Sequence, residues 1–219
     1  MPRAARCLIL VVTAVAMACG GSGTSHPSTN PTPDVHPLAP LAATGAIVTP
    51  TFALRLAPEL DWSARLGATR DIRRAMDDDI ASVLLERGLR RGWVMPADLA
   101  LSFKRNPTYA SDPYALAEEP LRSSSFIPGK RLAEPLASQL RTMMALHENA
   151  TVVLAPIELR FDRAGETPNA RATLRLAVID PRFSEARWVG EVKSDTTSAD
   201  PRVLTAALAR RLADLIVSR

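Results

Sequence analysis

The sequence predicts an α/β (α+β) domain in which helices pack on a single mixed sheet. Three segments carry apolar residues at helical spacing, and three later segments alternate apolar and polar residues as strands do. The two kinds of segment also follow one another along the chain. We therefore expect strand–helix–strand crossovers first, then antiparallel strands and a C-terminal helix.

The first half is expected to contain a strand at 47–56, a helix at 69–87, a strand at 89–95 and a helix at 96–105. The helix at 69–87 stops at Gly88, and a shorter helical piece is expected at 115–121. The helix at 69–87 carries an apolar stripe at helical spacing, formed by Ile72, Met76, Ile80, Val83 and Leu84.

The second half opens with a helix expected at 132–147, followed by a strand at 151–161. That strand begins as a continuous apolar run and then alternates. We therefore expect its first half to be buried on both faces and its second half to have one face in solvent. Antiparallel strands at 171–179 and 187–193 follow, with Arg171, Thr173 and Arg175 facing outward. A helix at 201–217 repeats the apolar stripe.

Composition limits the partners more than it defines them. The 219 residues are 47% hydrophobic and 23% charged, which suits one domain with a real core. The net charge of +4 falls to +2 without Arg3 and Arg6, so no nucleic-acid partner is expected. No cofactor is expected either, because Gly129-Lys130 lacks the earlier glycine and the following Ser or Thr of a phosphate loop.

The first 18 residues have the features of a signal peptide. Arg3 and Arg6 precede an apolar run at 8–17 that is too short to span a bilayer, and small residues follow. Cleavage is expected between Ala18 and Cys19. A lipoprotein would then be acylated on Cys19, whereas an ordinary secreted protein would be cut at the same bond without acylation.

Residues 19–43 are expected to form a lipid-anchor cysteine and a disordered tether, since Gly, Ser, Thr and Pro dominate them. At roughly 3 Å per residue in an extended form, such a tether reaches about 70 Å. His26 and His36 lie in it without neighbouring ligands. The remaining residues, 44–219, are expected to form a single globular domain attached to the bilayer through Cys19.

One stretch combines aromatic and basic residues most densely, and it is the candidate partner surface. Two interpretations stay open: a surface that binds sugar or phosphate, and a lid that covers the end of the sheet. The residues concerned are Tyr109, Tyr114, Lys104, Arg105 and Arg122.

Recognisable catalytic motifs are missing from the sequence, so no catalytic residue is assigned and the protein is not expected to be an enzyme. The one histidine of the domain, His147, lies near a helix C-terminus, where an imidazole is stabilised by the helix dipole. Successive residues 77–79 are aspartates, but they point about 100° apart on a helix and cannot converge on a metal ion. Two of the three carboxylates Asp162, Glu166 and Asp180 could act together as a glycosidase pair, so glycosidase activity stays an alternative.

The segment 174–180 followed by Trp188 resembles a strand that ends in Asp, turns and returns through a Trp. In this it is similar to the curli secretion lipoprotein, the lipoprotein activators of penicillin-binding proteins and the amino-terminal domain of TolB. The resemblance implies non-catalytic assembly or partner recognition in the bacterial envelope. It brings no catalytic residue with it.

Together these observations predict a lipid-anchored periplasmic module, held at the outer membrane, that acts on another envelope protein or on peptidoglycan. The alternative is a secreted soluble domain that binds a small molecule or glycan through the region from Tyr109 to Tyr114.

Overall fold

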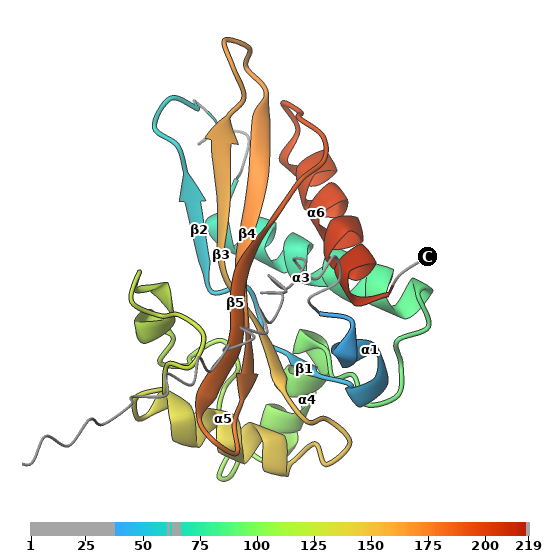
Figure 1. Cartoon of the computed structure of the whole chain (residues 1–219), viewed down its shortest axis with the longest axis vertical. Coiled ribbons are helices and arrows are strands. Elements are labelled where there is room, and N and C mark those ends of the chain that lie inside the picture. Colours follow the sequence, from blue (N-terminus) through green and yellow to red (C-terminus); the bar gives the residue numbers. More distant parts are fainter. Residues whose placement is uncertain (1–37, 61, 63–66, 218–219) are drawn as a thin grey trace, which may run out of the picture. The chain divides into compact units, whose positions relative to one another are not determined.

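A five-stranded sheet runs through the described part of the chain in the order β1–β3–β4–β5, with β2 also paired to β3 (Figure 1). The computed structural model describes residues 38–60, 62 and 67–217, all of which fall in the unit formed by residues 35–219. β1 and β2 are parallel to β3, whereas β3, β4 and β5 are antiparallel. The predicted fold class is confirmed: crossovers come first, and antiparallel strands and a C-terminal helix come last.

The strand expected at 47–56 is interrupted. Residues 49–52 leave the ladder, although the amides of Thr49 and Phe52 still donate to carbonyls of β3. The strands expected at 151–161, 171–179 and 187–193 occur, each slightly extended or shifted at its ends. The bounds are β1 Ile47–Val48, β2 Ala53–Leu56, β3 Val153–Arg163, β4 Ala170–Asp180 and β5 Glu185–Lys193.

Three of the long helices agree with their predicted bounds to within a residue, because periodicity and caps both mark their ends. α5 is shorter than predicted and begins directly after Pro135, which has no amide hydrogen to offer a preceding turn. The piece expected at 115–121 is a 3-10 turn. The bounds are α1 Pro40–Thr44, α3 Thr69–Glu86, α4 Pro96–Arg105, η1 Glu119–Arg122, α5 Leu136–Ala145 and α6 Pro201–Ile216.

The strand predicted at 89–95 is wrong. Only Val94 pairs, through a single parallel bridge to Ile47. The apolar character of this segment instead serves burial, because Leu89, Trp93 and Met95 are buried while their backbone turns at Gly88 and Gly92. A loop whose side chains are buried therefore has the same apolar sequence as a buried strand, and the sequence pattern does not distinguish the two.

The boundary predicted between tether and domain is also displaced. Residues 40–44 form helix α1, and the side chains of Leu38 and Leu41 are buried in the core. The packed domain therefore includes residues from 38 onward. Gly45, which ends α1 with φ of 70°, lies so close to Gly92 that an added Cβ would be 2.3 Å from the Gly92 carbonyl oxygen.

The two faces of the sheet are covered unequally. α3 and α6 pack on one face, where the registered row Leu54, Leu159, Leu174 and Val192 faces them. α4, η1 and α5 supply apolar residues to the other face, against the first half of β3 (Figure 1). β3 is accordingly buried from residue 153 to 157 and then alternates, as its sequence predicted.

Trp62 belongs to the core on the α3 and α6 side of the sheet. Its ring centroid lies 5.6 Å from that of Phe161, and only 2% of the residue is exposed. Within the described residues, no helix combines the length and apolarity needed to cross a membrane.

We predict that Leu208→Ala lowers the free energy of unfolding by about 2–5 kcal/mol, because Leu208 is fully buried between α6 and the sheet. The matched control is Val203→Ala on the same helix, where 44% of the residue is exposed and the loss should stay near 0.5 kcal/mol. Urea denaturation followed by circular dichroism measures both. Equal losses would contradict the assignment of the buried face of α6.

Candidate functional site

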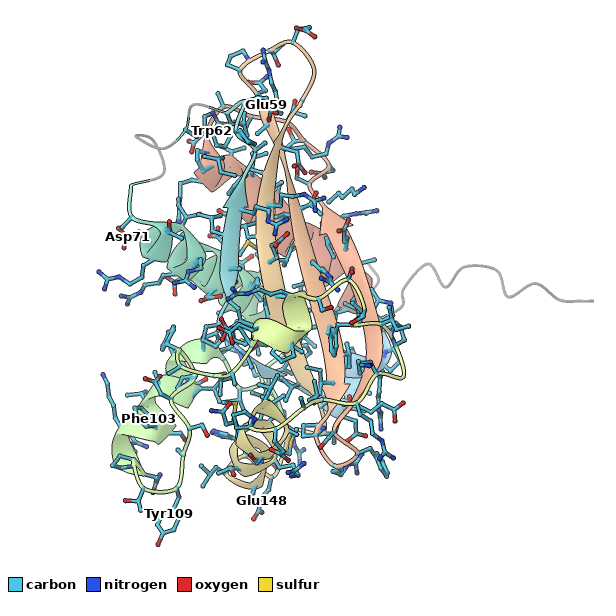
Figure 2. All side chains as sticks on the ribbon, turned by 90° about the vertical axis from the view of Figure 1, so that its left-hand side faces the viewer. Glu59, Trp62, Asp71, Phe103, Tyr109 and Glu148 are labelled. Carbon is cyan, nitrogen blue, oxygen red and sulfur yellow. The ribbon has the colours of Figure 1, made fainter. Side chains whose placement is uncertain are left out.

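The most distinctive surface is the half of the sheet that no helix covers. In Figure 2 the upper parts of β2, β3, β4 and β5 face the viewer, whereas η1 and the segment that follows it lie in front of the lower part. We call the uncovered half the open face. β1 pairs with the start of β3, at one end of the sheet. The open face lies at the other end, beside the hairpin that joins β3 to β4 after Arg163.

The registers place the side chains of the open face in rows across the strands. One row joins Ala53, Glu158, Arg175 and Glu191. The next joins Arg55, Arg160, Thr173 and Lys193, and a third joins Asp162 and Arg171. Registered partners share a face, so these residues form one continuous polar surface.

All three carboxylates of these rows lie close to an arginine. Glu158 lies 3.3 Å from the Nε of Arg55. Arg160 donates from Nε to Asp162 at 2.8 Å, and its Nη1 lies 3.8 Å from Glu191. The hydrogen bond to Asp162 is the main reason that the pKa of Arg160 is raised. The negative charge of the open face is thus already engaged by two arginines.

A cleft of about 530 Å³ lies at the hairpin end of the open face. Four cationic residues and a single acidic one line it, together with residues of the hairpin and the buried Thr173. Within the described residues, neither Arg171 nor Lys193 has an ion pair or a side-chain hydrogen bond. We call this the basic cleft. Its charged residues are Arg160, Arg163, Arg171, Lys193 and Asp162.

Arg163 fixes the hairpin that forms one wall of the basic cleft. Its Nη2 donates to the carbonyl of Glu166 at 3.0 Å, and its Nε donates to the carbonyl of Thr167 at 3.4 Å. Carbonyl acceptors leave the positive charge of the guanidinium uncompensated. Arg163 therefore holds the turn in place; it is registered with Ala170, next to the Asp162–Arg171 pair and on the other face of the ladder.

Arg175 marks the border between the open and the covered halves. Its guanidinium donates to the carbonyls of Arg122, Ser123 and Phe126 at 3.0–3.2 Å. The segment after η1 is thereby tied to β4. The edge of the open face is set by defined hydrogen bonds between a strand and the covering segment.

The candidate partner surface predicted from the sequence is spread over three elements. Lys104, Arg105 and Tyr109 lie at and beyond the end of α4, where 75% of Tyr109 is exposed and points away from the domain (Figure 2). Tyr114 is 62% exposed and lies beside α3. Arg122 belongs to η1 and pairs with Glu118. These five residues therefore do not form one surface: they lie beyond α4, beside α3 and in η1.

Asp77 of α3 is the buried carboxyl nearest to Tyr114. It is 6% exposed and accepts from the amide and the hydroxyl of Thr51, each at 2.8 Å. Burial raises its pKa to about 6, against the lowering effect of the Thr51 hydrogen bonds. Partial burial and the charge of Asp77 likewise raise the pKa of the Tyr114 hydroxyl.

Asp180 at the end of β4 is buried as deeply, with 1% of the residue exposed, yet it behaves differently. Burial by itself would raise its pKa, but the hydrogen bonds from Arg182 and the charges of Arg187 and Arg182 outweigh burial and lower it. Asp180 is therefore a structural anchor for the β4–β5 turn.

Among the residues that the structure describes, the remaining sequence-derived candidates do not assemble into a site. His147 lies beyond the end of α5, where burial lowers its pKa. Among the described residues, no three His, Cys, Asp or Glu side chains are grouped to hold a metal ion. Cys19 and Ala18, and with them the tether histidines His26 and His36, lie outside the described residues. A second cleft of about 480 Å³ lies beside α1 and includes Arg90, Arg91, Glu148 and Asn149.

Sequence reasoning missed the basic cleft. Alternation did predict that Arg171 and Thr173 face away from the core of α3 and α6, and the registers agree; Arg171 is exposed, whereas Thr173 is buried. The convergence of Arg163, Arg171 and Lys193 depends on two strand registers, and alternation within one strand does not determine a register. The usable signal was the repeated placement of cations on the outward positions of neighbouring strands.

No protein family matches the sequence, and no curated protein matches it. Among solved structures, the chain is similar to the PelC dodecamer from Paraburkholderia phytofirmans, with 12% identity and a TM-score of 0.33. A point variant of that protein gives 10% identity and a TM-score of 0.34. Each comparison covers 80% of this chain and 88% of the other. Likenesses this weak carry no argument about function, and they do not bear on the envelope-protein resemblance, which stays a prediction.

We predict that Asp77→Asn changes the pH dependence of stability. The carboxyl has a pKa of about 6 in the folded chain against 3.8 ordinarily, so the unfolded chain loses its proton first as the pH rises. The free energy of unfolding should therefore fall between about pH 4 and pH 6, by on the order of 3 kcal/mol, in a way that the variant lacks.

Urea denaturation of both proteins at pH 4, 5, 6 and 7 measures this difference. Asp78→Asn, on the exposed side of the same helix, is the matched control for the loss of one negative charge. Parallel pH profiles for Asp77→Asn and the unsubstituted protein would contradict the raised pKa.

Proposed function

We propose that the protein is a non-catalytic binding or assembly module, anchored in the bacterial envelope through a lipid on Cys19, that meets another envelope protein or peptidoglycan. Cleavage after Ala18, the proline-rich segment that follows and the outer-membrane location are parts of the same proposal. The observation that carries it is the open face, where charged side chains stand on rigid strands beside a cleft.

Exposure alone would not support a binding function, because antiparallel sheets commonly keep one face in water. The distribution of charge on the open face is what supports it. The carboxylates are engaged by Arg55 and Arg160, whereas Arg171 and Lys193 have no ion pair with any residue that the structure describes. Sites placed on strands are also held more rigidly than sites on loops.

The position of the open face suits an anchored protein. The chain enters the domain through α1 and β1, and β1 pairs with the start of β3. The basic cleft lies at the other end of β3, beside the hairpin. The surface offered to a partner is therefore at the end of the sheet remote from the point where the tether joins.

A second candidate is a secreted domain that binds a small molecule or glycan. It is favoured by the exposure of Tyr109 and Tyr114, because exposed tyrosines are frequent in contacts with sugars and other partners. Loss of glycan binding on Tyr109→Ala, with no acylation of the protein, would select this candidate.

We predict that the protein incorporates a palmitate analogue in its native host and fractionates with the envelope, whereas Cys19→Ser does neither. Cys7→Ser is the matched control, since Cys7 lies in the leader and its loss should leave labelling intact. An unlabelled wild-type protein would refute the anchor.

We predict for the partner that a photo-crosslinking residue at position 193 traps an envelope protein or peptidoglycan. The same residue at position 210, exposed on α6 and on the other side of the sheet, serves as the control. Crosslinks of equal yield from both positions would argue against the open face as the binding surface.

A further inference from the structure

We propose that the basic cleft is an oxyanion-binding site that takes the phosphate or carboxylate groups of an anionic ligand. This inference rests on the proposed binding function and names the ligand chemistry of that site. The residues that would bind are Arg171 and Lys193; Thr173, on β4 and registered with Lys193, and Arg163, at the hairpin, also line the cleft.

The charge of the cleft is the first step of the argument. Asp162 is opposite Arg171 in the β3–β4 ladder and is the carboxylate best placed to neutralise it. Its Oδ2 instead accepts from Arg160 at 2.8 Å. Arg171 consequently keeps its charge, although its ladder partner is an acid.

The spacing of the cations is the second step. Lys193 is registered with Thr173, and Arg171 is two residues from Thr173 on β4, on the same face. Cross-strand neighbours lie about 5 Å apart and alternate residues of one strand about 7 Å apart, which the long side chains of Arg and Lys span. Both cations can therefore reach a single oxyanion, the guanidinium through two parallel N–H groups.

The lining of the cleft selects among ligand classes. A metal ion would be repelled by four cations, of which only Arg160 is paired with the single carboxylate. Single-stranded nucleic acids need aromatic platforms for their bases, and among the described lining residues none is aromatic. A volume of about 530 Å³ exceeds that of one small anion, so the ligand has room to extend past the group that is held.

The test uses the mature chain with Cys19→Ser, so that it does not depend on acylation. Pyrophosphate is the phosphate probe, trigalacturonate is the carboxylate probe and maltotriose is the neutral one. Isothermal titration calorimetry at low and high salt measures each. Binding of pyrophosphate alone or of trigalacturonate alone identifies the group, and either supports the site.

Arg171→Gln/Lys193→Gln should weaken binding at least tenfold, because each lost charge-assisted contact alone accounts for about that factor. Both residues are exposed, so the variant should fold, and circular dichroism checks this. The matched control, Arg210→Gln/Arg211→Gln, removes the same charge from the exposed side of α6 and should change affinity less than twofold. Lys193→Arg should retain binding.

Three outcomes would overturn the proposal. They are the absence of binding by either anion at low salt, equal weakening by the control variant, and equal binding of maltotriose. The second would show a response to net charge with no site. None of the three bears on labelling of Cys19, so failure of this site and failure of the anchor are distinguishable.

Discussion

The pairing of β3 with β4 is the constraint on which the rest of the structure depends. Ten registered pairs join two strands of 11 residues, each about 36 Å long at the usual rise. α3 and α6, at 18 and 16 residues, extend about 24–27 Å and cover much of one face. On the other face α5 has 10 residues and extends only about 15 Å. The open face is the part of the sheet beyond α4, η1 and α5, which supply apolar residues only to the first half of β3 (Figure 1).

Pro156 explains why the sheet is irregular at its centre. It is the fourth of the 11 residues of β3 and has no amide hydrogen to give to a neighbouring strand. The register of β3 against β4 shifts between Pro156 and Glu158, and the gap between β1 and β2 falls beside the same position. α3 then secures the interrupted segment, because Asp77 accepts from Thr51 and Arg73 donates to the carbonyl of Phe52.

Periodicity predicted the elements whose burial repeats regularly, and it failed where burial is local. α3, α4 and α6 were found because apolar stripes and end signals agree. The segment at 89–95 misled because Trp93 and Met95 are buried from a loop, which leaves the same apolar trace as a strand. Leu38 and Leu41 were assigned to the tether because prolines surround them, and packing against the core outweighs that composition.

The basic cleft illustrates a conflict between stability and binding. The ladder holds Arg171 and Lys193 on the same face of neighbouring strands whether or not an anion is present, and like charges about 4 Å apart repel by about 1 kcal/mol per pair in water. Salt within a Debye length of about 8 Å reduces this cost without removing it. Asp162 is the carboxylate nearest to Arg171 along the ladder, but it accepts a hydrogen bond from Arg160 instead of pairing with Arg171. An anion that enters the cleft removes the repulsion as well as forming new contacts, so its binding and the stability of the hairpin are thermodynamically linked.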